Sequence, residues 1–281
     1  MTAFATGRWH RVAVIARDEY RRALETRWLF AFTVLFAALV LGVSYFGLVQ
    51  SREVGFQGFA RVTLSLMNLV LLVVPLIGLL LGVTSLAGGG ETLPLLLAQP
   101  VTRGEVLAGK FAGLSLALAA AQALGFGSGG LVIALNAGTD QVPGFVTLTA
   151  LSLLLGWLSI AAALGLAAIW PDRFRAMSAA LILWLVMVVA YDLVVLGVTS
   201  VLRGLPLETV LIPALLVNPV DLARVTVTLA VGSGALFGPT SAVLARRFGS
   251  EGGIALGLAV MVIQTLVPLW IAARVFRRRD W

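Results

Sequence analysis

Long apolar stretches that contain no Asp, Glu, Lys or Arg alternate with short charged segments along this chain. Such charge-free stretches cover residues 62–90, 111–139 and 141–171. A helix needs about 20 apolar residues to cross the roughly 30 Å hydrocarbon layer of a bilayer, and each stretch is longer than that. The pattern predicts an all-α polytopic membrane protein.

Counting apolar stretches of sufficient length predicts six transmembrane helices. They cover residues 29–49, 63–87, 111–136, 146–170, 177–200 and 254–273. The first is too long for the apolar part of a signal peptide, so we interpret it as a retained span. A seventh candidate, residues 225–245, is rich in Gly, Ser and Thr and contains Pro239. Because it would insert poorly, we expect a re-entrant or interfacial pair of short helices within an extracytoplasmic segment, residues 201–253.

The first 28 residues form a segment of a different kind. Residues 9–28 show a helical repeat, with an apolar stripe on one face and most of the charged residues on the other. The stripe consists of Val12, Ile15, Ala16, Tyr20, Ala23, Leu24 and Trp28. The pattern predicts an amphipathic helix along the cytoplasmic membrane surface. Two interpretations remain open: a surface anchor, or an elbow helix that also contacts a cytoplasmic partner.

Composition and charge agree with a single membrane domain over residues 1–281. The chain is 60% hydrophobic and 12% charged, with a mean hydropathy of +1.02, and no segment outside the spans can bury a core of its own. With six spans, most Arg and Lys residues lie on the side that carries both termini, which the positive-inside rule assigns to the cytoplasm. The net charge of +7 therefore reflects topology and contact with anionic lipid, and no nucleic-acid binding is expected.

Several kinds of chemistry are excluded or disfavoured by residue type. Cysteine is absent and His10 is the only histidine, which excludes disulfides, thiolate chemistry and His-based metal sites. An intramembrane enzyme would need a His, Cys or paired-carboxylate centre. An ion-coupled transporter would need several charges inside the spans, where only Asp192 qualifies. No catalytic, metal-binding or cofactor-binding residue is expected in this chain.

The loop between the second and third spans, residues 88–110, reads GGGETLPLLLAQPVTRGEVLAGK. Thr92 can cap a short apolar helix that Pro94 begins and Pro100 ends. Thr102 and Glu105 then form a capping box for a helix that continues into the third span. An apolar helix on the cytoplasmic side needs a protein groove to cover it; a simple tight loop is the alternative.

The stretch from Gly104 to Lys110 matches the glycine and lysine positions of a phosphate-binding loop. The match fails at Phe111, where Ser or Thr must coordinate Mg²⁺, and no strand precedes it. The chain therefore has no nucleotide motor of its own. The small-residue pair Gly109 and Gly113, like Gly78 with Gly82 and Gly125 with Gly129, allows helices to approach closely, either within one chain or at a dimer seam.

Polar residues near the end of the fifth span are the other candidates for function. Asp192 follows Tyr191 inside an apolar span, so it is protonated, paired or in a wet cavity. Two interpretations remain open: a role in translocation, or a position near the outer interface where Tyr191 or an Arg of the next segment satisfies it. Asn218, Pro219 and Asp221 form a turn that can cap a helix beginning near Leu222.

These motifs carry a resemblance to a known family. The string ETLPLLLAQPVTRGEVLAGKF resembles the coupling-helix region of type-2 ABC exporter permeases, although Pro94 stands where the family has Glu. The upstream ARDEYRRALETRW and the six-span layout are also similar. Within that superfamily the chain is most similar to the permeases of nitrous-oxide-reductase maturation transporters (NosY-type). This similarity rests on the N-terminal two thirds of the chain and on YDLVVLG and NPVDLARV at residues 191–197 and 218–225.

The resemblance implies a permease in the bacterial inner membrane that pairs with a second copy of itself. Two copies of a separate cytoplasmic ATPase subunit, which binds ATP and Mg²⁺, would drive it. The residues expected to contact that ATPase are Glu91, Thr92, Leu93, Leu95, Gln99, Pro100, Arg103 and Glu105. Tyr191 and Asp192 would act in translocation or gating, and Asn218, Pro219 and Asp221 would lie in the exit region or contact an extracytoplasmic partner.

The expected function is transport or conformational work at the periplasmic face during maturation of the copper centre of nitrous oxide reductase, with a periplasmic copper-binding accessory protein as a partner. The alternative is export of a lipid, peptide or drug. Copper itself is a poor cargo, because soft metals prefer Cys, Met or His ligands and the methionines inside the spans show no paired spacing. Transfer of a sulfur species and mechanical work on a copper chaperone both remain open.

Overall fold

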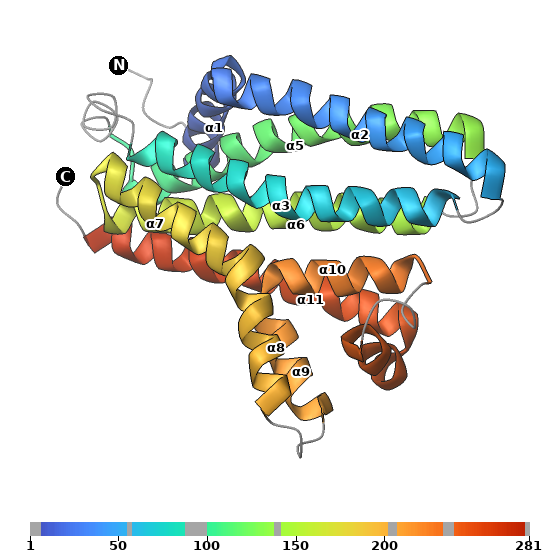
Figure 1. Ribbon diagram of the computed structural model, residues 1–281. Helices are drawn as coiled ribbons and strands as arrows, with labels where there is room; N and C mark the ends of the chain where they lie inside the picture. Colours follow the sequence, from blue (N-terminus) through green and yellow to red (C-terminus); the bar gives the residue numbers. More distant parts are fainter. Residues whose placement is uncertain are drawn as a thin grey trace.

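The computed structural model describes residues 7–54, 58–87, 100–137, 142–201, 207–232 and 239–278. Helices are the only regular secondary structure in these ranges (Figure 1). They are α1 (Arg8–Glu25), α2 (Arg27–Val54), α3 (Gly58–Leu86), α5 (Arg103–Ala137), α6 (Val142–Ile169), α7 (Arg173–Leu185), the π-helix η1 (Val186–Ala190), α8 (Tyr191–Val201), α9 (Leu207–Val217), α10 (Pro219–Ala230) and α11 (Pro239–Arg278).

Six helical segments among the described residues are long and apolar enough to cross a membrane. They are Arg27–Phe46, Thr63–Leu86, Arg103–Val132, Val142–Ile169, Arg173–Gly197 and Arg246–Arg278. These correspond one to one with the six predicted spans, so the prediction of an all-α polytopic membrane protein is confirmed. The fifth of them is made of α7, η1 and α8 together.

The seventh candidate, residues 225–245, does not form one spanning helix. Its first part ends α10 at Ala230, and its last part lies in α11, which begins at Pro239; residues 233–238 lie outside the described residues. The range given for α11 joins two helices across a kink at Gly249, whose φ of 72° breaks the helical geometry, a conformation that glycine adopts without a steric penalty. The part before the kink is therefore a short helix distinct from the final span.

Helix α6 lies at the centre of the bundle, with α3, α5, α10 and α11 packed around it. Close packing against α3 depends on two glycines. A Cβ atom on Gly78 would lie 2.8 Å from Cβ of Ser159, and one on Gly82 would lie 2.5 Å from Cβ of Ala163. Because these distances are too short for real Cβ atoms, the Gly78 and Gly82 pair serves packing within the chain.

The contact between α2 and α5 uses the second small-residue pair in the same way. Gly125 lies against the ring of Phe36, and Gly129 lies against Val40. The Phe36 ring stacks on Phe32 and meets Phe126 edge to face, with ring centroids 5.2 Å apart in both cases. Of the two uses left open for these glycines, packing inside one chain is the one observed.

One end of the bundle gathers segments that are far apart in the sequence. Helix α1 lies at the end where α5 and α7 begin and α11 finishes (Figure 1). The guanidinium of Arg103 donates a hydrogen bond to the carbonyl of Arg277 at 3.2 Å, which joins the start of α5 to the end of α11. At η1 the chain changes direction, so that α8 and α9 project from the side of the bundle (Figure 1).

Candidate functional site

The predicted ATPase-contact residues fall partly outside the described residues. Glu91, Thr92, Leu93, Leu95 and Gln99 lie in the range 88–99, which the structure does not describe. Pro100 is exposed immediately after this range, and Arg103 and Glu105 lie in the first turn of α5. The described part of the region is therefore the start of α5 and the helices that contact it.

The start of α5 has the predicted capping box. The backbone N–H of Thr102 donates to Oε2 of Glu105 at 2.8 Å, and the backbone N–H of Glu105 approaches Oγ1 of Thr102 at 3.3 Å. Each side chain thus satisfies a backbone donor that the first turn leaves free. The helix beginning here runs without interruption to Ala137, as the sequence predicted.

Glu105 also binds the N-terminal helix. Its Oε1 accepts a hydrogen bond from the guanidinium of Arg11 at 2.7 Å, and the Glu105 side chain is only 2% exposed. The Arg11 contact and the capping box together occupy both carboxylate oxygens. In this structure Glu105 therefore faces α1 and ties it to the start of α5.

A second ion pair joins α1 to α5 and α3. The ammonium of Lys110 donates to Oε2 of Glu19 at 2.8 Å, and to the carbonyl and hydroxyl oxygens of Ser85 at 2.9 and 3.1 Å. The Ser85 hydroxyl donates in turn to Oε1 of Glu19 at 2.5 Å. Lys110 and Glu19 are both buried, and this network satisfies all three Lys110 donors. The lysine of the phosphate-loop near-match is thus committed to an internal contact.

Between the two ion pairs, α1 and α5 approach each other at two glycines. A Cβ atom on Gly109 would lie 2.6 Å from a methyl group of Ile15, and one on Gly113 would lie 2.5 Å from the carbonyl oxygen of Ala16. Close backbone contact flanked by ion pairs makes α1 and the first turns of α5 one packed unit. We call this unit, α1 with residues 102–113, the coupling unit.

The apolar stripe predicted for residues 9–28 is divided in the structure. Ile15, Ala16 and Ala23 are buried together with Glu19, whereas Leu24 and Trp28 are 42% and 65% exposed. The helix also ends earlier than predicted, because the extended backbone of Thr26 ends α1 at Glu25 and Trp28 belongs to α2. Reasoning from sequence also missed Arg11, Glu19 and Lys110. The available signal was that Glu19 lies one helical turn from both Ile15 and Ala23, on the apolar face.

The second candidate region lies where η1 meets α10. A π-helix inserts one extra residue into a helical turn and leaves carbonyl groups without their usual partner. Here the side-chain amide of Asn218 donates to the carbonyl of Met187 at 2.8 Å. The side-chain oxygen of Asn218 caps α10 by accepting from the backbone N–H of Val220 at 3.1 Å, with Pro219 in the first turn. The predicted cap is confirmed, although α10 starts at Pro219, three residues before the predicted start.

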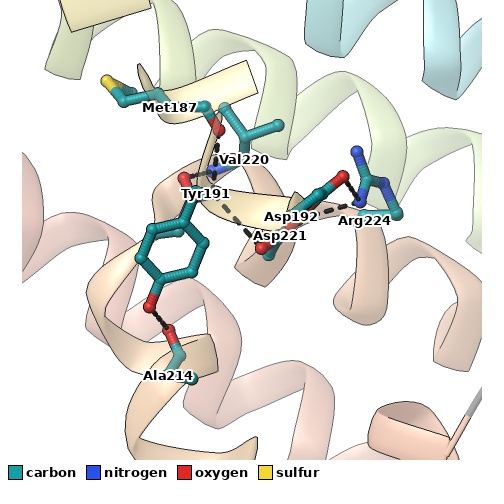
Figure 2. A network of polar contacts seen from close by, with 8 residues as sticks. Met187, Tyr191, Asp192, Ala214, Val220, Asp221 and Arg224 are labelled. Atoms are coloured by element: carbon teal, nitrogen blue, oxygen red, sulfur yellow. Dashed lines mark hydrogen bonds and ion pairs between the residues drawn. The ribbon is translucent and has the colours of Figure 1, made fainter. Parts of the chain in front are cut away.

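Arg224 joins the two helices by contacting two carboxylates. Its guanidinium lies 2.9 Å from Oδ2 of Asp192 on α8 and 2.9 Å from Oδ1 of Asp221 on α10 (Figure 2). Nearby, the hydroxyl of Tyr191 donates to the carbonyl of Ala214 on α9 at 2.6 Å. Of the two interpretations of Asp192, the structure shows the pairing with an Arg of a following segment. We call Asp192, Asn218, Asp221 and Arg224 the α8–α10 cluster.

The charge state of this cluster depends on Asp221, which lies on α10, outside the six candidate spans. Burial raises the pKa of Asp221 from its ordinary value of 3.8 to about 7, and the hydrogen bond and charge of Asp192 act in the same direction. Arg224 and Asn218 oppose this rise in the pKa. Burial and Asp192 therefore favour the protonated form of Asp221 relative to an exposed carboxyl group.

The part of the chain that the structure describes contains no candidate metal-binding site. No three or more His, Cys, Asp or Glu side chains in these ranges lie close enough together to hold a metal ion. The polar chemistry of the described residues is instead ion pairing between helices. Such ion pairs hold helices together while they are formed, and the helices can separate when the ion pairs break.

Comparison with known proteins gives a consistent result. A family model described as "ABC-2 family transporter protein" matches residues 13–281. A protein of Stutzerimonas stutzeri named "Probable ABC transporter permease protein NosY" is 34% identical over 276 residues, which cover 94% of this chain and 97% of that protein. A protein of Pseudomonas aeruginosa with the same name is 39% identical over 222 residues, which cover 76% of this chain and 80% of that protein.

Proposed function

This chain belongs to the ABC-2 family of transporter proteins as a permease similar to NosY proteins, and we propose that it acts in the maturation of the copper centre of nitrous oxide reductase. The observation that carries the proposal is the similarity to two proteins named NosY, one of them along almost the whole length of both chains. Two of the segments that resemble NosY-type permeases, 191–197 and 218–225, include every member of the α8–α10 cluster.

Energy for this work would come from a separate ATPase subunit on the cytoplasmic side, with one copy for each of two permease chains. We propose that the ATPase, with ATP and Mg²⁺ bound, docks on the loop from Glu91 to Glu105. The basic ends of the chain support a cytoplasmic position for this loop, because Arg103 contacts Arg277 and α1 carries several exposed Arg residues. The membrane would be the bacterial inner membrane.

The coupling unit would transmit the displacement of that loop. Its two ion pairs and two glycine contacts join α1 to α5, and Ser85 extends the contact to the end of α3. Packed elements of this kind move together as a body because interiors resist local compression. Motion of the residues before Arg103 would therefore reach three helices at once.

We propose that the α8–α10 cluster holds the exit closed. Asp192 lies on α8 just after η1, where the fifth span changes direction and leaves the side of the bundle (Figure 1). Separation of α8 from α10 would break the contact of Arg224 with Asp192. The first turn of α10, which Asn218 caps and which contains Pro219 and Asp221, would lie beside an extracytoplasmic partner. A copper-binding protein is the expected partner.

The cargo would be a sulfur species, or the work would be a conformational change in the extracytoplasmic partner. Copper is a poor cargo for this chain, because cysteine is absent and the only histidine, His10, precedes the first span. A second copy of the chain would complete the transporter, as in ABC permeases generally. Exposed apolar side chains on α8, among them Leu193, Val194 and Leu196, offer surface for such pairing.

The proposal is tested in a denitrifying bacterium that lacks the gene for this chain. Restoring the gene is expected to restore the copper-centre absorbance of purified nitrous oxide reductase and the consumption of nitrous oxide. Normal reductase in the deletion strain would contradict the proposal and favour the alternative, export of a lipid, peptide or drug. An ATPase pull-down tests docking separately. Leu95→Arg and Arg103→Glu should each abolish capture of the ATPase, while Arg17→Glu, an exposed change on α1, should not.

Gating is tested by substitution of Asp192, the acid of α8 that pairs with Arg224. Asp192→Leu is expected to abolish the restoration of reductase at normal expression, because Arg224 loses a partner on α8. Full activity of this variant would leave the pairing with only a structural role.

A further inference from the structure

A groove of about 690 Å³ runs along the outer side of the bundle between the end of α6 and α7. Its walls are mainly apolar, with Leu166 on α6, Ile182 on α7 and Val186 at the start of η1. The polar groups gather at one end, where Trp170, Arg175 and Ser178 line it. The groove is therefore polar at one end and apolar along the rest of its length. Such a surface matches a ligand that has a charged head and an apolar tail.

The length of the groove matches one leaflet of a bilayer. From Arg175 to Val186 the chain advances 11 residues, or about 16 Å at 1.5 Å per residue. Half of the roughly 30 Å hydrocarbon layer is about 15 Å. Since Arg175 lies two residues after the start of a spanning segment, the charged end lies at the membrane surface and the apolar end lies near the midplane.

The positive charge of Arg175 in the groove favours a ligand with an anionic head group. Arg175 is the only ionisable side chain that lines it, and the structure records no ion pair for this guanidinium among the described residues. Exposed basic residues between spanning helices at the membrane surface attract the phosphate of anionic lipids, and Trp residues prefer the same depth. Ser178, one turn along α7, adds a hydroxyl donor at the same end.

A second copy of the chain fits this groove less well. In a two-fold contact, the same surface of each copy faces the other. To pair Arg175 across such a contact, the groove would need an acidic residue of its own. The groove itself has no acidic residue to offer. The opposite flank of α7 is already occupied, because Ala176 and Ala180 are buried against α3 and Trp184 donates to the carbonyl of Leu72.

We propose that this groove binds one anionic phospholipid, with its phosphate at Arg175 and Ser178 and one acyl chain lying along α7 as far as Val186. Val186 is the first residue of η1, so the bound lipid borders the point where the fifth span changes direction. The proposal concerns lipid binding by the isolated chain and holds independently of ATP use or reductase maturation.

The test measures lipid retained by the full-length chain, purified in detergent without nucleotide and mixed with phosphatidylglycerol or phosphatidylcholine of the same acyl chains. Native mass spectrometry reports the bound lipid. Arg175→Gln is expected to lower phosphatidylglycerol retention about fivefold and to lower phosphatidylcholine retention less, because the choline ammonium offsets the phosphate charge. Ala179→Phe, which fills the apolar part of the groove without changing charge, should lower retention of both lipids. Arg17→Gln removes one exposed charge from α1 and should have no effect.

Three results would overturn the proposal. The first is unchanged phosphatidylglycerol retention in Arg175→Gln. The second is an equal loss in Arg17→Gln, which would mean attraction by surface charge in general. The third is an Ala179→Phe variant that keeps its lipid but loses its dimer in size-exclusion chromatography, which would make the groove a seam between two copies. Failure of the reductase experiment would leave the lipid result unaffected.

Discussion

Lys110 and Glu19 are 91 positions apart in the chain, yet the ammonium of one lies 2.8 Å from the carboxylate of the other inside the coupling unit. The pair joins α1, which precedes the first span, to α5, which forms the third span. Removing one partner leaves the other charge buried without compensation, which costs much more than removing both.

Lys110→Met is therefore expected to lower the free energy of unfolding by about 3–5 kcal/mol. The double variant Glu19→Gln with Lys110→Met should recover a large part of that loss, because no isolated charge remains. Thermal unfolding of the purified protein, followed by loss of the monodisperse peak in size-exclusion chromatography, measures both. Equal destabilisation by the single and double variants would show that the ion pair itself is unimportant.

The two contacts of Glu105 can be separated by substitution. Glu105→Gln keeps a side chain suited to the capping box but loses the charge that holds Arg11. Glu105→Ala loses both contacts and should be less stable than Glu105→Gln by about 1 kcal/mol, the usual contribution of a helix cap. The same unfolding assay checks the order, and Arg8→Gln, an exposed change on α1, serves as the control.

Close approach of α1 and α5 predicts a strong effect of one added methyl group. Gly113→Ala would bring a Cβ atom within 2.5 Å of the carbonyl oxygen of Ala16, so α1 must shift, at a cost of about 1–3 kcal/mol. Gly127→Ala is the matched control on the same helix, because no atom lies within 4 Å of its added Cβ. Similar melting temperatures for the two variants would contradict the close packing of the coupling unit.

Asn218 contacts two backbone groups, those of Met187 and Val220, and its amide also donates to Oδ2 of Asp221 at 3.2 Å. Substitution can distinguish the two backbone contacts. Asn218→Asp retains the oxygen that caps α10 but loses the amide hydrogen donated to Met187. Amide exchange in residues 186–191 is expected to rise about threefold, the equivalent of one interhelical hydrogen bond in a membrane. Exchange at the first turn of α10 should stay unchanged, whereas Asn218→Ala should raise exchange at both places. Unaltered exchange near Met187 in both variants would refute the assigned contact.

The raised pKa of Asp221 predicts a pH dependence of stability. Because the folded protein binds this proton more tightly than the unfolded chain does, the free energy of unfolding falls as pH rises from about 4 to about 7. Melting temperatures measured across this interval should decline in the wild type and decline less in Asp221→Asn. Asp18→Asn, on the exposed face of α1, should keep the wild-type slope. A slope that Asp221→Asn leaves intact would assign it to another group.

Features carried by a few neighbouring residues could be predicted from the sequence. Apolar runs long enough to cross a bilayer, five of them free of charged residues and one containing Asp192, predicted all six spans. The capping residues Thr102, Glu105 and Asn218 were found because each acts within three or four positions of its partner. The small-residue pairs were recognised, but their role required knowledge of which helix lies opposite.

Features that depend on distant partners were not predicted. The burial of Glu19 becomes favourable only because Lys110 and Ser85 lie beside it, and no local signal identifies them. The π-helix at residues 186–190 reads VMVVA, an ordinary apolar sequence. Its exposed carbonyl is satisfied by Asn218, 31 positions after Met187. Local pattern therefore sets where the helices are, and polar contacts between helices decide how they bend and which faces they bury.

The contacts of α1 also set an order of assembly during synthesis. This helix leaves the ribosome before α5, and its ionic partners Glu105 and Lys110 follow 94 and 91 residues later. Until the start of α5 has been translated, Arg11 and Glu19 lack these partners. Helix α1 therefore reaches its final position only after the spans formed by α2 and α3 have been made.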